Sequence, residues 1–285
     1  MTIQVDTCTP SAVLDRVSLV LDAFDGPGQL TLAQIVRRTG LPRSSAHRML
    51  ERLVQLRFLR RRGRDYELGM RLVELGHLAV HQDRVHRAAM PFLWDLHRAT
   101  GLVVHLAILD GTDVIYLEKI GDRLAAALPS RVGGRHPAHC TAVGKAMLAY
   151  ADEKRLTDFD TDLLTRKTRH SIATRAQLRT ELNKVHAHGY AFDREESVPG
   201  FGCVAASIGT VDEAVAAVSV SGPVDRMAFD HRLTAPVRTT ALHIWRNLDD
   251  GSTRVHPTLQ RMRPLCRGPV QPPIATARPR ALQYA

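Results

Sequence analysis

The chain has few cysteines and aromatic residues and no long apolar run. Four cysteines, Cys8, Cys140, Cys203 and Cys266, are far apart, without the spacing of a metal site or a disulfide framework. No run of about eighteen apolar residues and no leader-like start are present. We therefore expect a cytoplasmic protein with reduced thiols and no membrane contact. We find no pattern for a catalytic residue, metal or cofactor, so we do not expect an enzyme. With 285 residues, 44% of them hydrophobic, the chain has room for about two domains.

Positive charge is abundant, and it is concentrated in two segments. The chain carries a net charge of +10. Residues 43–64 hold eight arginines and one glutamate, and residues 249–285 hold six arginines and two aspartates. The remainder of the chain is close to neutral. A basic segment of this kind, set in an otherwise balanced chain, indicates a nucleic-acid partner.

Residues 31–53 predict two short helices joined at a glycine. Thr31 is a suitable N-cap for the first helix, and Gly40 can adopt the left-handed conformation that ends it. The second helix begins after Pro42 with one apolar stripe, formed by Ala46, Met49, Leu50 and Leu53. Its opposite face suits base reading in a major groove. The candidate DNA-binding residues on this face are Arg43, Ser44, Ser45, His47, Arg48 and Arg52.

An arginine-rich turn follows the two helices. Residues 58–59 and 66–68 have the pattern of two short strands around it. This arrangement predicts a winged helix-turn-helix that binds double-stranded DNA, with the wing along the phosphate backbone. The candidate wing contacts are Arg60, Arg61, Arg62 and Arg64.

The remaining pattern predicts an α+β chain. We expect a flexible arm at 1–10, the DNA-binding domain at 11–68 with an opening helix at 11–24, and a linker helix at 69–84. A second domain with an antiparallel sheet follows at 85–248, and a disordered basic tail rich in proline at 249–285. In the second domain we expect a helix over 85–100 and a β-hairpin over 102–120.

Two features of the second domain indicate a ligand. The loop 131–137 carries Arg131 and Arg135 and leads to a helix that begins near Thr141, where free amides would favour an anion. The strand 215–221 places Ser219 and Ser221 on one face. These features predict binding of a small organic carboxylate.

Four segments together carry a resemblance to a known family: 41–48, 139–146, 189–196 with Cys203 seven residues later, and 219–222. By these motifs the sequence, from about Ser11 to Leu248, resembles the IclR-type bacterial transcriptional regulators. It implies a GAF-like effector-binding domain after the linker, and a homodimer or tetramer acting as repressor or activator at a palindromic operator. By the same motifs the effector pocket would be lined by Leu128, Ala142, Val143, Asp193, Cys203, Ser219 and Ser221. Cys140 and the basic tail depart from the family pattern.

Other interpretations remain open at this point. Cys203 could be a small buried hydrophobe, and the two serines could lie on the wet face of an edge strand. A thiol hydrolase could use Cys140 or Cys203 with His139. A metal sensor could use His77 with His81, or His136 with His139, although neither pair has further ligands at suitable spacing.

Overall fold

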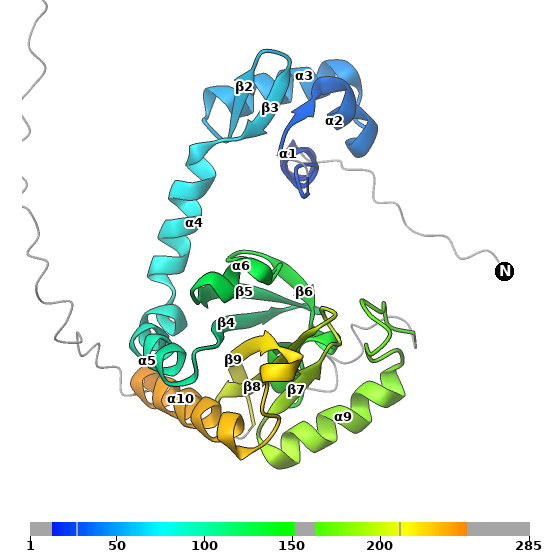
Figure 1. Ribbon diagram of the computed structural model, residues 1–285. Coiled ribbons are helices and arrows are strands. Elements are labelled where there is room, and N and C mark those ends of the chain that lie inside the picture. The colour runs from blue at the N-terminus through cyan, green and yellow to red at the C-terminus, as the bar shows by residue number, and fades with distance from the viewer. Residues whose placement is uncertain (1–12, 27, 152–162, 211, 250–285) are drawn as a thin grey trace, which may run out of the picture.

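The computed structural model describes residues 13–26, 28–151, 163–210 and 212–249. The predicted arm at 1–10 and all but the first residue of the predicted tail lie outside these ranges. Figure 1 shows two folded parts connected by the helix α4. None of the helices in the described ranges is long and apolar enough to cross a membrane.

The N-terminal part is a winged helix-turn-helix. It comprises α1 (Val13–Asp22), β1 (Leu30–Thr31), α2 (Leu32–Thr39), α3 (Arg43–Gln55), β2 (Leu59–Arg62) and β3 (Asp65–Leu68), with the strands in the antiparallel order β1-β3-β2. Thr31 and Gln34 form a capping box at the start of α2, and Gly40 ends it with φ of 68°. The two helices and the turn between them follow the sequence prediction. The wing differs, because Arg60, Arg61 and Arg62 lie on the strand β2 and not in the turn, which is confined to residues 63–64. The opening helix is shorter than expected in the described residues, since it ends at Asp22.

The helix α4 (Met70–Gln82) connects the two parts and has no buried residue. Its bounds agree with the predicted linker helix. Asp83 then caps α5 (Arg84–Thr100) by accepting from the His86 amide, and Gly101 ends α5 with φ of 63°.

The second domain is a six-stranded antiparallel sheet with the order β6-β5-β4-β9-β8-β7. The strands are β4 (Val103–Asp110), β5 (Asp113–Ile120), β6 (Arg135–Pro137), β7 (Ala191–Arg194), β8 (Phe201–Gly209) and β9 (Ala214–Pro223). Besides α5, the helices in the described residues of this domain are α6 (Arg123–Ala127), α7 (Ala142–Leu148), α9 (Arg175–His188) and α10 (His231–Asp249). Two short 3₁₀ turns lie at Ala138–Cys140 and Val224–Arg226. The predicted α+β class is confirmed.

Because side chains alternate between the two faces of the sheet, the sheet separates two hydrophobic cores. On β9, Val218 and Val220 pack with α5 and α10 on one face, whereas Ala217 packs with α7 and α9 on the other. Ser219 and Ser221 share the second face, as the pattern predicted. Because β9 is paired on both sides, with β4 and β8, these serines are buried and do not lie on an edge strand.

Candidate functional site

The helix α3 carries the first candidate site. Its apolar stripe is buried against the N-terminal core through Ala46, Leu50 and Leu53. The six predicted DNA contacts lie away from that stripe: Arg43, Ser44, Arg48 and Arg52 are exposed, and Ser45 and His47 are half-buried. One face of the helix is therefore polar, basic and open to solvent, as a base-reading helix requires.

The wing arginines fall into two groups. Arg60 and Arg62 both pair with the carboxylate of Glu67 on β3. Arg61 instead lies over the Tyr66 ring, 5.6 Å from its centroid, while Arg64 is exposed in the turn. We did not single out Glu67 from the sequence, because one acid among many arginines has no local signature.

The second candidate site is a small cavity at the α7 face of the sheet. All seven residues predicted to line an effector pocket lie around it, and they come from five parts of the chain. Strand pairing explains the convergence, because Asp193 on β7 is opposite Cys203 on β8, and Cys203 is opposite Ser221 on β9. Sequence reasoning missed several other lining residues, among them His105, Tyr116, Ser130, His136, Thr141 and Ser197.

His105 organises hydrogen bonds at the base of the cavity. Its Nε2 lies 2.8 Å from Ser130 Oγ, and its Nδ1 lies 3.4 Å from Ser221 Oγ. Burial lowers the pKa of His105 to about 3, so the imidazole is neutral and uses one nitrogen as donor and the other as acceptor. Within the described residues, the buried Ser219 Oγ has no strong hydrogen-bond partner, and its polar neighbour is the Cys203 thiol. A thiol is a weak hydrogen-bonding group, so a polar ligand atom would stabilise this site.

The helix α7 lies beside the cavity and is packed closely against the turn that precedes it. Thr141 caps it by accepting from the Gly144 amide at 3.1 Å, and Ala142 and Val143 of the first turn line the cavity. A Cβ at Gly144 would lie 2.2 Å from the carbonyl oxygen of Ala138. Glycine is required here because the backbone of α7 is pressed against the turn that precedes it.

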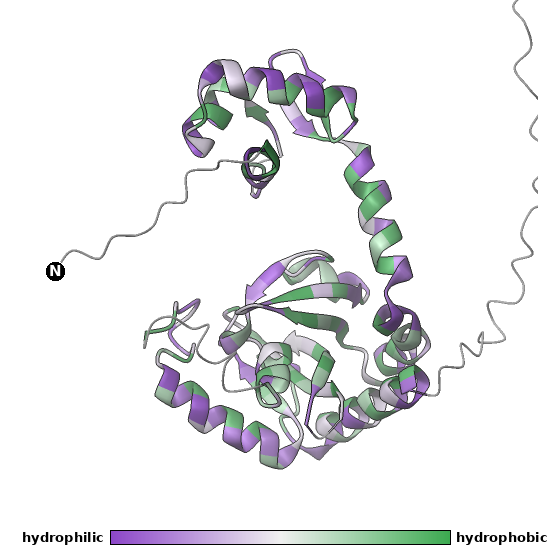
Figure 2. Cartoon of the chain, turned by 180° about the vertical axis from the view of Figure 1, so that it is seen from behind, coloured by the Kyte–Doolittle hydropathy of each residue, from purple (hydrophilic) through white to green (hydrophobic). Residues whose placement is uncertain are grey.

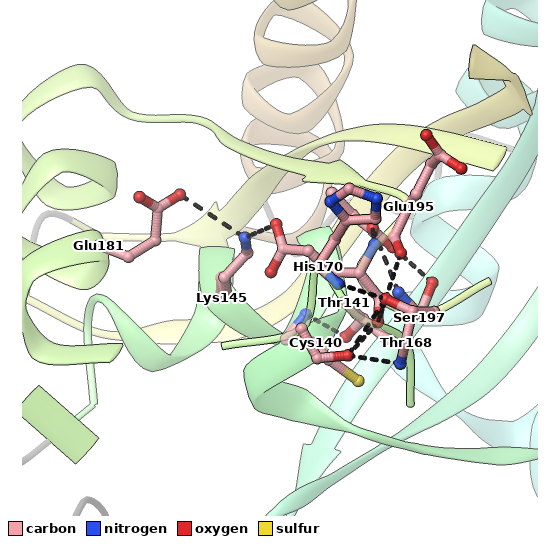
Figure 3. A network of polar contacts seen from close by, with 12 residues as sticks. Cys140, Thr141, Lys145, Thr168, His170, Glu181, Glu195 and Ser197 are labelled. Carbon is pink, nitrogen blue, oxygen red and sulfur yellow. Dashed lines mark hydrogen bonds and ion pairs between the residues drawn. The ribbon is translucent and has the colours of Figure 1, made fainter. Parts of the chain in front are cut away.

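A buried ionic network supports the cavity wall at residues 193–198 (Figure 3). Lys145 is fully buried, with its Nζ 2.6 Å from Glu196 Oε1 and 3.6 Å from Glu181 Oε1. Asp193 accepts from the Glu196 amide at 2.6 Å and from Ser197 Oγ at 2.5 Å. Burial raises the pKa of Asp193. The carboxylate that we predicted as a pocket contact therefore holds the wall turn in place.

The two loop arginines do not reach the cavity, which corrects the expected source of positive charge. Arg135 pairs with Asp110 and Asp113, and Arg131 Nη2 lies 3.4 Å from Asp25 Oδ1. Neither arginine lines the cavity, and among the residues that the structure describes no other arginine and no lysine does. The interior offers neutral donors, namely hydroxyls, the imidazole and the first amides of α7.

The free space inside the cavity is small in this conformation. It is about 30 Å³, which is room for about two water molecules. Any organic ligand must therefore displace part of the wall as it enters.

The alternative chemistries are not supported by the geometry. Burial raises the pKa of both Cys140 and Cys203 to about 12, so neither is a thiolate at neutral pH. The His139 Nε2 lies 3.0 Å from the Thr165 carbonyl oxygen, and Cys140 donates to the Pro137 carbonyl. His77 and His81 stack on the exposed helix α4, and the part of the chain that the structure describes holds no cluster of three metal-ligand side chains.

These parts define a regulator in which a basic winged helix is joined to a ligand-binding domain. Comparison with known families agrees: residues 13–63 match the IclR helix-turn-helix domain, and residues 77–246 match the C-terminal domain of bacterial IclR transcriptional regulators. The chain therefore belongs to the IclR family of DNA-binding transcriptional regulators, as the sequence motifs suggested. It is not an enzyme.

Individual relatives cover most of the chain. The transcriptional regulator XynR of Escherichia coli is 35% identical over 213 residues, which are 73% of this chain and 84% of XynR. The transcriptional repressor IclR of the same species is 30% identical over 73% of this chain and 77% of its own length. The crystal structure of an IclR homologue from Microbacterium hydrocarbonoxydans, complexed with 4-hydroxybenzoate, superposes with a TM-score of 0.74. It has 27% identity and covers 84% of this chain and all of that chain.

Proposed function

We propose that a small organic acid is the effector and that it binds in the cavity between α7 and the sheet. The observation that carries this proposal is the buried Ser219 hydroxyl, which lines the cavity and, in the described residues, has only the weakly bonding Cys203 thiol beside it. The family member complexed with 4-hydroxybenzoate supports the ligand class. The proposed contacts are Leu128, Ala142, Val143, Asp193, Cys203, Ser219 and Ser221, with Asp193 acting through the wall turn.

The carboxylate would be held by neutral donors. With Arg131 and Arg135 directed elsewhere, the donors available at the cavity are the serine hydroxyls and the N–H groups of Ala142 and Val143, which have no acceptor within their own helix. Hydrogen bonds to a charged group are worth about 1.5–3 kcal/mol, so three or four of them can replace an ion pair.

The test is ligand binding and its effect on DNA affinity. Aromatic and short aliphatic acids are screened by thermal shift with the wild type, with Ser219→Ala/Ser221→Ala, and with Ser207→Ala, a β8 serine outside the cavity lining. We expect binding that the double variant loses and the control retains. Coupling of about 1–3 kcal/mol would change operator affinity by roughly 5- to 150-fold. A ligand that binds the double variant equally well places the effector elsewhere.

We propose that α3 reads base sequence and the wing binds the backbone. The exposed face of α3 supplies Arg43, Ser44, Ser45, His47, Arg48 and Arg52, and the wing supplies Arg60, Arg61, Arg62 and Arg64. Arg48→Ala should cost about 1–3 kcal/mol on the operator and little on random duplex. Arg64→Ala, in the exposed turn, should weaken both alike. Equal losses on both duplexes for Arg48→Ala would contradict base reading.

We further propose that a second copy of the chain covers α4, giving a homodimer or tetramer on a palindromic operator. Met70, Val73 and Leu78 on this helix are 57%, 59% and 50% exposed, and Figure 2 shows apolar residues along much of it. Two winged helices related by a twofold axis fit two half-sites. Val73→Asp should therefore yield monomers by light scattering and weaken operator binding. Monomeric wild type with full operator affinity would contradict the proposal.

We also propose the domain limits that the sequence suggested, with the DNA-binding domain at 11–68, the linker at 69–84 and the effector domain at 85–248. Because its partner is chromosomal DNA, we place the protein in the bacterial cytoplasm. Limited proteolysis of the monomeric variant Val73→Asp, in which α4 is not covered, tests the limits: cleavage should concentrate in 69–84 and leave the flanking parts intact.

A further inference from the structure

Glu67 is a buried carboxylate inside a basic wing. It lies on β3 with an exposure of 4%. Arg60 is directly opposite on β2 and forms an ion pair with it through Nε. Arg62 Nε lies 3.6 Å from Oε1, and Gln29 Nε2 donates to the same oxygen at 2.6 Å. One acid on β3 thus contacts two arginines of β2 and the residue that precedes β1.

This placement is unfavourable for simple attraction to DNA. A carboxylate repels phosphate and cancels part of the charge that the wing offers. A neutral glutamine at the same position could keep a hydrogen bond to Gln29 without that penalty. The arrangement therefore calls for a benefit other than charge.

The benefit is that the arginine side chains are conformationally ordered before DNA binds. A free arginine side chain carries about 2 kcal/mol of rotamer entropy, which a phosphate contact must overcome. Arg60 and Arg62 lie on one face of the wing, where both form ion pairs with Glu67, whereas Arg61 lies on the other face over Tyr66. Cations held in one orientation fit phosphates in one docking register, while flexible cations can bind any backbone.

We propose that Glu67 is a positioning residue that sets DNA specificity through Arg60 and Arg62. These arginines contact phosphate when α3 is seated in its operator, and they add little to loosely docked, non-specific complexes. The inference rests on the proposed wing contact with the backbone. The new element is the condition for that contact: Arg60 and Arg62 contact phosphate only when α3 is seated in its operator.

The magnitude follows from counterion release. Glu67→Gln frees two guanidinium groups, and each new phosphate contact steepens the plot of log affinity against log salt by about 0.9. At about 0.1 M salt, one such contact raises affinity for random duplex by about eightfold. The operator, which Arg60 and Arg62 already contact, should gain less or lose affinity. The ratio of operator to random affinity therefore falls.

The experiment uses the full chain and an operator selected from a random duplex library with wild-type protein. Affinity for the operator and for a scrambled duplex is measured over a series of salt concentrations for the wild type, Glu67→Gln and Glu67→Asp. Glu74→Gln is the matched control, because Glu74 also pairs with two arginines, Arg57 and Arg71, but lies on α4 outside the wing. We expect a lower specificity ratio and a steeper random-duplex slope only in Glu67→Gln, with partial recovery in Glu67→Asp.

The outcomes separate the inference from the function beneath it. Equal factors on both duplexes in Glu67→Gln, as expected for Glu74→Gln, would overturn the role of Glu67. A second variant, Arg60→Gln/Arg62→Gln, leaves Glu67 in place and gives a test if Glu67→Gln fails to fold. It should weaken operator binding and leave random binding nearly unchanged. If Arg60→Gln/Arg62→Gln binds both the operator and the random duplex as tightly as wild type, the wing does not contact the backbone. If it loses affinity equally for both duplexes, the contact does not depend on the operator.

Discussion

Gly144 provides a test of how tightly α7 is built into the effector domain. A Cβ added there would lie 2.2, 2.4 and 2.6 Å from the carbonyl oxygen, Cα and carbonyl carbon of Ala138. These are backbone atoms, so no side-chain rotation can relieve the overlap. Gly76 is the matched control, because it also lies within a helix, α4, and a Cβ there meets nothing within 4 Å.

The two substitutions should change stability in opposite directions. Replacing glycine by alanine inside a helix stabilises it by about 0.5–1 kcal/mol when the site has room. At Gly144 this gain is exceeded by displacement of α7, for which overpacked cores show losses of about 1–3 kcal/mol or more. Each kcal/mol corresponds to roughly 2–4 °C of Tm in a domain of this size. Gly144→Ala should therefore lower the Tm of the effector domain by several degrees, and Gly76→Ala should hold or raise the stability of the linker helix.

The readouts separate the two parts of the chain. Both tryptophans, Trp94 and Trp245, lie on α5 and α10, so their fluorescence follows the effector domain, while far-ultraviolet circular dichroism follows total helix. Ligand binding should also weaken in Gly144→Ala, since Ala142 and Val143 shift with α7. Wild-type stability and ligand affinity in Gly144→Ala would refute the close approach. So would a change of the same sign and size in both variants.

Three further predictions follow from the buried titratable groups. Because the pKa of His105 is lowered from 6.5 to about 3, the unfolded chain binds a proton that the folded chain refuses, so the part of the stability that depends on His105 is highest above pH 6.5 and falls as the pH drops. The loss attributable to His105 should be about 2 kcal/mol by pH 5, and unfolding of His105→Gln should lack that part of the pH dependence. Lys145→Met leaves Glu196 buried without its cation and should lower the free energy of unfolding by about 3–5 kcal/mol, as measured with urea. The double variant Lys145→Met/Glu196→Gln should recover much of that loss. A Lys145→Met variant as stable as wild type would contradict the network. Cys140 and Cys203 should resist alkylation at mildly alkaline pH until the protein unfolds, as peptide mass spectrometry can show; rapid native labelling of either would contradict their raised pKa values.

The sequence by itself determined the local structure. The ends of helices are set by hydrogen bonds and backbone angles that span only a few residues, as at Thr31, Gly40 and Gly101. The apolar residues of α3 recur with the period of a helix, and the same periodicity identifies the opposite, DNA-facing side of α3. The family motifs also anticipated seven residues around one cavity, because those motifs carry information that periodicity lacks.

Only the tertiary structure decided the electrostatics of both sites. His105 meets Ser221 across 116 positions of sequence, and Lys145 meets Glu196 across 51. Arg131 and Arg135, which a local interpretation places beside an anion, pair instead with aspartates outside the cavity. Charge interactions depend on distance and burial in three dimensions, whereas caps and stripes depend on separation along the chain. For that reason the positions of helices and strands could be predicted here, and the partners of the buried charges could not.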